Sequence, residues 1–157
     1  MTKLKYYNSE LLELDHDEFG EILIHKDTDE PVTGIVWKNF SDGNKLYESS
    51  YLKGKIHGYD KEWYRNGKLK FFSTRYKDIL HGVWVFKTDT GFLDTKKIFS
   101  YGYCLSTEYY KEGVLQKVEK IEKDSDKLAS YQKRKSELEA SGESKEWNKV
   151  LKWIEDI

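Results

Sequence analysis

Cysteine and proline are almost absent from this chain. One cysteine, Cys104, and one proline, Pro31, occur in 157 residues. A single thiol cannot close a disulfide within the chain, so we expect the protein to be cytoplasmic. The sequence also lacks an apolar run of the roughly 20 residues that a membrane helix needs, and its N-terminus lacks the apolar segment of a signal peptide. We therefore expect no membrane span.

The usual signs of catalysis and of metal binding are missing as well. Cys104 has no histidine within ten residues, and the acidic runs lack the spacing of a calcium loop. The chain has no glycine-rich phosphate loop and no nucleophile elbow. His57 and His81 each precede a glycine and are 24 residues apart, which is typical of a structural position in a repeat. We expect no metal, no cofactor and no enzymatic activity.

Neither sign of charge is in excess overall, but the charges are unevenly placed. The net charge is −1, whereas residues 1–33 carry 3 basic against 9 acidic side chains and residues 34–116 carry 14 against 9. The net charge of +5 on residues 34–116 is spread too thinly, and lies too close to the net charge of −6 on residues 1–33, to predict direct binding to nucleic acid. A plain structural interpretation is that the acidic and basic parts complement each other at the surface.

What the sequence does have is a repeat. Glycines recur at intervals of 24 residues in two series, which are Gly34, Gly58 and Gly82, and Gly43, Gly67 and Gly91. Aromatic residues make up 15% of the chain, which argues for a buried core in spite of the many charged residues. The predicted units cover residues 34–57, 58–81, 82–106 and 107–121, with a partial copy at 20–33.

Each unit alternates aromatic and β-branched stretches with turn residues. Asn66-Gly67 is the preferred dipeptide of a two-residue type I′ turn, in which both central residues need a positive φ. A second turn per unit follows, and Gly58 and Gly82 are expected in turns too, so one period predicts one hairpin and the bend to the next. We expect about eight strands in an open twisted antiparallel meander, within a domain of residues 1–121.

The pattern changes to a helical period in the C-terminal extension, residues 122–157. Ser125 is expected to cap a first amphipathic helix that stops at Gly142. Ser144 is expected to cap a second helix, whose apolar face is formed by Trp147, Val150, Leu151 and Ile154. The predicted fold class is therefore mainly β with C-terminal helices (α+β), in which two amphipathic helices cap the meander. The alternative use of this tail is as a contact between two copies of the chain.

The repeat units resemble the MORN-variant repeat of bacterial proteins described as antitoxins of toxin–antitoxin systems. The resemblance covers about residues 20–118 and rests on "DEPVTG" followed by units of the form "G-x-x-x-x-W-Y-x-N-G-K-L" and "Y-x-x-G-K-x-H-G". The best matching positions are Gly58, Trp63, Tyr64, Asn66, Gly67, Leu69, His81 and Gly82. The resemblance implies an open twisted sheet of stacked hairpins and a protein-binding role.

Two sets of residues are candidates for contact with a partner. Adjacent aromatic residues in a strand place rings on both faces of a sheet, and a face that the helices leave open would present Trp37, Tyr59, Trp63, Tyr64 and Trp84. The second set is acidic and comprises Asp15, Asp17, Glu18, Asp27, Asp29 and Glu30. It would fit a basic, nuclease-type toxin.

The leading hypothesis from the sequence is a non-catalytic antitoxin or immunity protein that neutralises a cognate toxin by binding and occluding it. The alternative is a structural scaffold or oligomerisation module built of MORN-like repeats, without a toxin partner. A neighbouring gene whose product kills when expressed alone would favour the first hypothesis.

Overall fold

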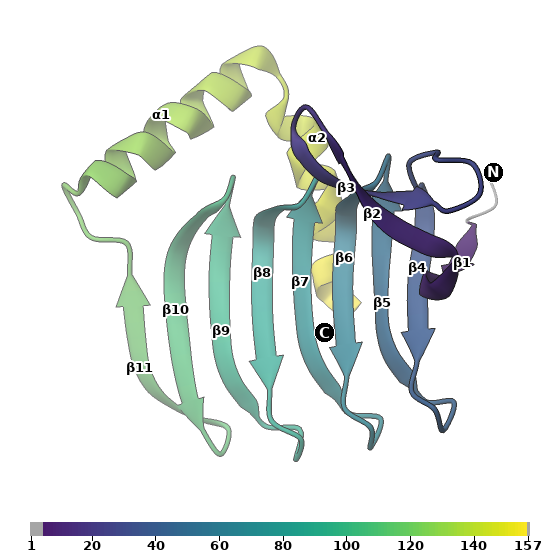
Figure 1. Cartoon of the computed structure of the whole chain (residues 1–157). Coiled ribbons are helices and arrows are strands. Elements are labelled where there is room, and N and C mark those ends of the chain that lie inside the picture. Colours follow the sequence, from purple (N-terminus) through teal and green to yellow (C-terminus); the bar gives the residue numbers. More distant parts are fainter. Residues whose placement is uncertain (1–4, 157) are drawn as a thin grey trace.

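A computed structural model describes residues 5–156 and places eight consecutive antiparallel strands side by side in one sheet (Figure 1). The strands are β4 (Gly34–Asn39), β5 (Lys45–Leu52), β6 (Lys55–Trp63), β7 (Leu69–Tyr76), β8 (Ile79–Lys87), β9 (Leu93–Ser100), β10 (Tyr103–Lys111) and β11 (Val114–Lys120). Their order in the sheet follows their order in the chain. The predicted fold class, an antiparallel meander with C-terminal helices, is thereby confirmed.

The turns at the two ends of the strands differ in kind, except that the β10–β11 turn at Glu112-Gly113 is of the type found at the opposite end. At the end that includes the β5–β6 and β7–β8 connections, the turns have two central residues of positive φ, Lys53-Gly54 and Lys77-Asp78, as a type I′ turn requires. The turn predicted at Asn66-Gly67 lies at the opposite end and is not of this type. Only Gly67 has a positive φ there. The loop is longer, and Tyr64 donates its N–H to the carbonyl of Lys68.

Asn66 explains why the longer loop forms. Its side-chain oxygen accepts the N–H of Lys68 at 3.0 Å, and its side-chain amide donates to the carbonyl of Asp89 in the next loop at 2.8 Å. A local side-chain acceptor of this kind replaces the backbone bond of a tight turn. The prediction of a turn at Asn66-Gly67 is confirmed, but the predicted type I′ geometry is wrong.

A regular set of hydrogen bonds joins the β5–β6, β7–β8 and β9–β10 turns to the preceding repeat. Gly54 donates its N–H to the carbonyl of Val32 at 2.8 Å, and Asp78 donates to Ile56 at 2.7 Å. In the third repeat, Gly102 donates to Leu80 at 2.9 Å. Successive repeats are thus connected beyond the strand ladder itself, as expected for an array in which each unit contacts its neighbours.

The C-terminal segment covers one face of the sheet over β6–β8, behind the strands in Figure 1. It consists of α1 (Asp126–Ser141), α2 (Ser144–Asn148) and the 3-10 helix η2 (Lys149–Asp156). The core on this covered face contains Ile35, Tyr59, Phe72, Val83 and Val85, with Trp153 and Ile154 of η2 packed against it. Trp147 and Val150 are buried, so the predicted apolar face of the second helix does contact the sheet.

The prediction that Gly58 and Gly82 lie in turns is wrong. They lie inside β6 and β8, with φ of 114° and 107°. Both are places where η2 approaches the sheet. A Cβ on Gly58 would lie 3.1 Å from Nε1 of Trp153, and one on Gly82 would lie 2.9 Å from Cδ2 of Leu151. The 24-residue glycine period therefore serves close packing as well as turns.

The first helix, α1, does not cover the sheet face. Ser125 caps it and Gly142 ends it in the left-handed conformation, as predicted, but α1 has no buried residue and runs past the end of β9–β11 (Figure 1). Tyr131 makes its contact with the sheet, through a hydroxyl 3.3 Å from Oγ of Ser100. The predicted cap at Ser144 is wrong, because the N-cap position is Glu143 and no side chain bonds to the helix end.

The N-terminal segment lies on the opposite face, in front of the strands in Figure 1. β1 (Tyr6–Asn8) pairs in parallel with β4, and after the 3-10 turn η1 (Ser9–Leu11) the strands β2 (Leu12–Asp17) and β3 (Gly20–His25) form a separate two-stranded sheet. Leu12 and Val32 pack against Val36 on this side. The partial copy expected at 20–33 thus supplies a strand, but that strand pairs with β2 and lies outside the meander.

Candidate protein-binding face

Three aromatic side chains meet on the sheet face opposite the C-terminal segment, over β7 and β8. Phe71 lies directly across from Phe86, and Ser73 lies across from Trp84. Because Val85 points to the covered face and neighbours in a strand alternate, Trp84 and Phe86 point the other way. We call this side the open face, since Figure 1 shows no described element in front of β8 and the three rings are only half-buried.

The rings of this cluster contact one another and a lysine. The centroids of Phe71 and Trp84 are 5.5 Å apart in an edge-on arrangement, and those of Trp84 and Phe86 are 6.5 Å apart. Nζ of Lys97 lies 5.1 Å from the ring centroid of Trp84. Partly buried aromatic rings with a charged rim are the composition that protein interfaces favour.

A polar cluster separates these rings from the N-terminal segment on the same face. Oγ of Ser49 donates to the carboxylate of Asp60 at 2.6 Å, and Nε of Arg75 lies 3.9 Å from the same carboxylate. Arg75 also donates to Oγ of Ser73 at 3.3 Å. Burial raises the pKa of the Asp60 carboxyl, and the hydrogen bond from Ser49 opposes that rise. Each member has a partner within the chain, so the cluster is explained as structure.

The predicted acidic residues all lie on the N-terminal segment, but in two separate places. Asp15, Asp17 and Glu18 are at the end of β2 and in the turn that follows, whereas Asp27, Asp29 and Glu30 follow the far end of β3. All six are exposed. Asp17 also has a structural part, because it accepts the N–H of Phe19 at 2.8 Å and lies 3.6 Å from Nζ of Lys55.

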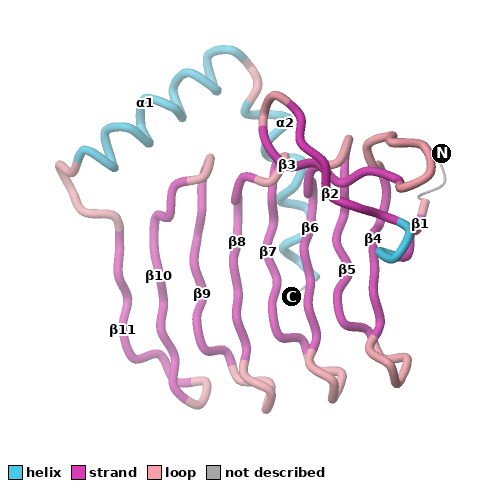
Figure 2. The backbone as a smooth tube through the Cα atoms, in the orientation of Figure 1, coloured by secondary structure: helices cyan, strands magenta, loops and turns pink. Residues whose placement is uncertain are grey.

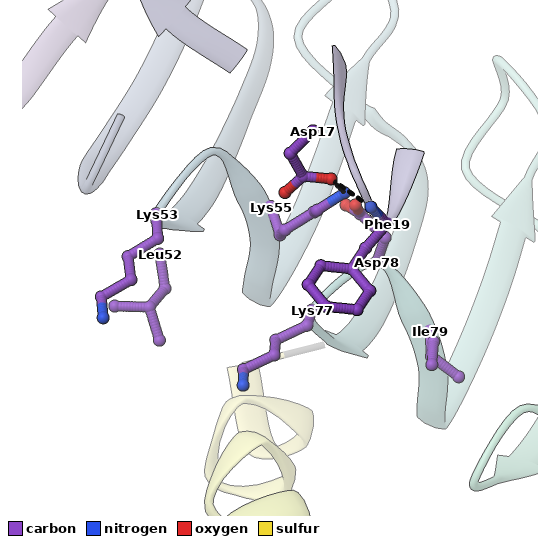
Figure 3. A pocket seen from close by; sticks show the side chains of 8 residues that line it. All are labelled: Asp17, Phe19, Leu52, Lys53, Lys55, Lys77, Asp78 and Ile79. Atoms are coloured by element: carbon purple, nitrogen blue, oxygen red, sulfur yellow. Dashed lines mark hydrogen bonds and ion pairs between the residues drawn. The ribbon is translucent and has the colours of Figure 1, made fainter. Parts of the chain in front are cut away.

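A groove of about 670 Å³ runs between the β2–β3 turn and the two-residue turns of the large sheet (Figure 3). It is lined by Asp17, Phe19, Leu52, Lys53, Lys55, Lys77, Asp78 and Ile79. Lys55 is held by the carbonyl of Glu21 at 2.7 Å, and Asp78 accepts the N–H of Ile56. Figure 3 shows Lys53 and Lys77 directed away from Asp17, whereas Lys55 reaches its carboxylate.

Of the five predicted aromatic contact residues, only Trp84 belongs to the cluster on the open face. Tyr59 is wrong as a surface residue: it is 6% exposed, and its hydroxyl donates to Glu48 beneath η2. Tyr64 donates its hydroxyl to the carbonyl of Lys87, and Trp63 lies under Nζ of Lys45 at 5.3 Å. Trp37, the fifth, lies opposite Glu48 and so points to the covered face.

His81 packs against the helical segment, where its ring lies 5.4 Å from that of Trp147. Nδ1 of His81 accepts the N–H of Tyr101 at 3.0 Å, so the ring proton is on Nε2, which lies 3.0 Å from Oδ1 of Asn148. His57 packs against Tyr76 with a centroid distance of 5.0 Å. Among the described residues no group of three His, Cys, Asp or Glu side chains could hold a metal ion.

Acidification is expected to weaken the fold through these histidines. Burial lowers the pKa of both His57 and His81 below 6.5. The unfolded chain therefore binds protons that the folded chain does not, and stability is lost as the pH falls below about 6.5, by at most ~1.4 kcal/mol per pH unit for each histidine. Urea unfolding between about pH 7.5 and 5.5 measures this loss.

His81→Asn is the matched variant for this experiment. The asparagine oxygen can replace Nδ1 as acceptor for Tyr101 but does not titrate. The free energy of unfolding of the variant should change less over the same pH range than that of the unmodified protein. An identical slope in both proteins would show that His81 does not contribute to the pH dependence.

Within residues 5–156 no helix is long and apolar enough to cross a membrane. Comparison of the chain with models of known protein families, with curated proteins and with solved structures finds no match in any of the three.

Proposed function

We propose that this chain is a MORN-variant repeat protein of the antitoxin or immunity type, which acts without catalysis by binding a toxic protein and occluding its active site. The observation that carries the proposal is the ring cluster of Phe71, Trp84 and Phe86, whose rings are only partly buried on the open face. Binding energy at protein interfaces is concentrated in rings of this kind.

The placement of charge supports a partner that reaches both the open face and the N-terminal segment. That segment packs over β4 and β5 on the same side of the sheet as the rings, and its six acidic side chains are exposed. Complementary charge mainly speeds association and fixes orientation. A toxin that acts on nucleic acid has a basic active site, so the proposed partner is a basic, nuclease-type toxin in the cytoplasm.

Trp84→Ala is expected to weaken toxin binding by about 2 kcal/mol, a factor of roughly 30, because a half-buried ring at the centre of an interface is lost. The matched control is Trp37→Ala, which removes the same side chain from the covered face. The measurement is calorimetric titration of the purified toxin, with circular dichroism to confirm folding. An equal loss in both variants would place the interface elsewhere.

Charge reversal separates the acidic contribution from the aromatic one. Asp15, Asp27 and Asp29 are replaced by lysine, while Asp17 is kept because it holds the β2–β3 turn and Lys55. Association should slow at low salt and the difference should shrink at high salt, since surface charges are screened. Unchanged association rates would show that the acidic residues are not part of the interface, while the proposed role of the ring cluster would be unaffected.

The cellular test is co-expression of the chain with the neighbouring gene whose product is toxic when expressed alone. Rescue of growth by the unmodified protein, with loss of rescue in Trp84→Ala and retention in Trp37→Ala, supports the proposal. The scaffold alternative predicts that no such toxic neighbour is neutralised. Absence of rescue by the unmodified protein would end the antitoxin proposal.

A further inference from the structure

The last strand of the meander, β11, is an open edge. All seven of its residues are exposed, including Leu115 at 48% and Val118 at 45%. At the other edge of the sheet, β1 pairs with β4. Beyond the end of β11 the chain turns outward in a loop and continues into α1, and no described element lies beside β11 along its outer side (Figure 2). Among the described strands, β11 pairs with β10 alone.

The hydrogen-bonding direction of β11 can be fixed from one bond. Ile121 donates its N–H to the carbonyl of Leu105 at 2.8 Å, so this N–H points toward β10. The direction alternates along an antiparallel strand. The backbone groups of Glu119 therefore face β10 as well, whereas those of Val118 and Lys120 face outward, where no described strand pairs with them. An edge of this kind is a template for a further strand.

We propose that β11 pairs with β11 of a second copy of this chain, antiparallel and around a two-fold axis normal to the sheet, so that the two sheets become one. Residues directly opposite in such a pair share a face. The symmetry then requires one residue of β11 to lie opposite its own copy. Each choice of this central residue gives a different register and a different set of charge pairs.

Only one register that spans the strand avoids like charges and forms opposite pairs. Centres at Lys117, Glu119 or Lys120 place two identical charges directly opposite, which is destabilising. A centre at Val118 places the two valines together and puts Lys117 opposite Glu119 of the second copy, twice by symmetry. Lys117 and Glu119 already form an ion pair within the strand, so the dimer would hold four alternating charges on one face.

This self-complementarity identifies the strand that pairs with β11 as β11 of a second copy of the chain. The outward groups of Val118 would be satisfied by Val118 of the other chain, and Lys120 would lie opposite Gln116, the residue at the bulge of β11. The exposed Val118 side chains would meet at the axis. β11 lies three strands away from Trp84 on β8, so the dimer neither requires nor blocks the toxin-binding role proposed above.

Val118→Pro tests the strand pairing without breaking the fold. The N–H of Val118 points away from β10, so proline there removes an outward donor and no bond of the β10–β11 ladder. The unmodified protein should sediment as a dimer at about 100 μM, and the variant should have a dissociation constant at least about tenfold higher. The control, Val118→Ala, keeps the N–H and should remain largely dimeric.

Charge swapping tests the register. Lys117→Glu alone and Glu119→Lys alone each place like charges opposite one another, so both variants should be mainly monomeric. An equal mixture of the two variants restores opposite charges at both positions and should form a heterodimer. Lys77→Glu, far from β11, should dimerise like the unmodified protein. A monomeric unmodified protein, or a mixture that associates no better than the single variants, would overturn the proposal.

Discussion

Gly82→Ala is expected to lower the free energy of unfolding by about 3 kcal/mol or more and to loosen the C-terminal segment. Gly82 has a φ of 107°, which a side chain disfavours. Its Cβ would collide with Oγ1 of Thr74 and lie 2.9 Å from Cδ2 of Leu151 on η2. The Thr74 hydroxyl cannot move freely, because it donates to the carbonyl of His81 at 2.6 Å and accepts the N–H of Val83.

Gly67→Ala is the matched control for this prediction. Gly67 also has a positive φ, 84°, but a Cβ there would meet nothing within 4 Å. Its cost should be the conformational one alone, about 1 to 2 kcal/mol. Urea unfolding of both variants gives the comparison. Equal losses would mean that η2 does not depend on close approach at Gly82.

Trp147→Ala is expected to cost about 3 to 5 kcal/mol, the usual range for removing a large buried ring. Trp147 is 4% exposed and stacks on Tyr76 with a centroid distance of 4.4 Å. It also contacts the rings of His81 and Tyr101 edge-on, at 5.4 and 5.3 Å. These contacts join the start of the covering segment to the turns of two successive repeats, so their loss should release α2.

Two measurements check this prediction. Urea unfolding gives the free energy, and limited proteolysis reports whether the residues after Gly142 become accessible before the sheet unfolds. The comparison variant is Trp84→Ala, whose ring is half-buried on the open face, and its loss of stability should be clearly smaller. A similar stability in both variants would show that the covering segment contributes little to the fold.

The meander itself could be predicted from the sequence, since turn residues and aromatic strands alternate with a fixed period. The different uses of the glycines could not. Gly58 and Gly67 occupy successive places in one unit, yet Gly67 forms a loop and Gly58 allows Trp153 to approach β6. A period in sequence reports that a backbone freedom recurs. It does not report whether a turn or a neighbouring helix requires that freedom.

The candidate face was predictable only in part. Trp84 was named from the sequence, but its neighbours Phe71 and Phe86 were not, because their meeting depends on strand register. Every antiparallel pair from β4–β5 to β10–β11 contains an irregularity in register, and no local pattern places these bulges. Tyr59 was wrongly expected at the surface because the position of η2 on the sheet depends on long-range packing.

The arrangement of the two terminal segments has a mechanical consequence. The N-terminal segment holds β4 and β5 from one side, and η2 holds β6–β8 from the other. β10 and β11 extend beyond both, supported through the strand ladder and by the contact of Tyr103 with Tyr131. The sheet is therefore supported on its faces at β4–β8 and free at the other end, so we expect it to bend most easily at β11.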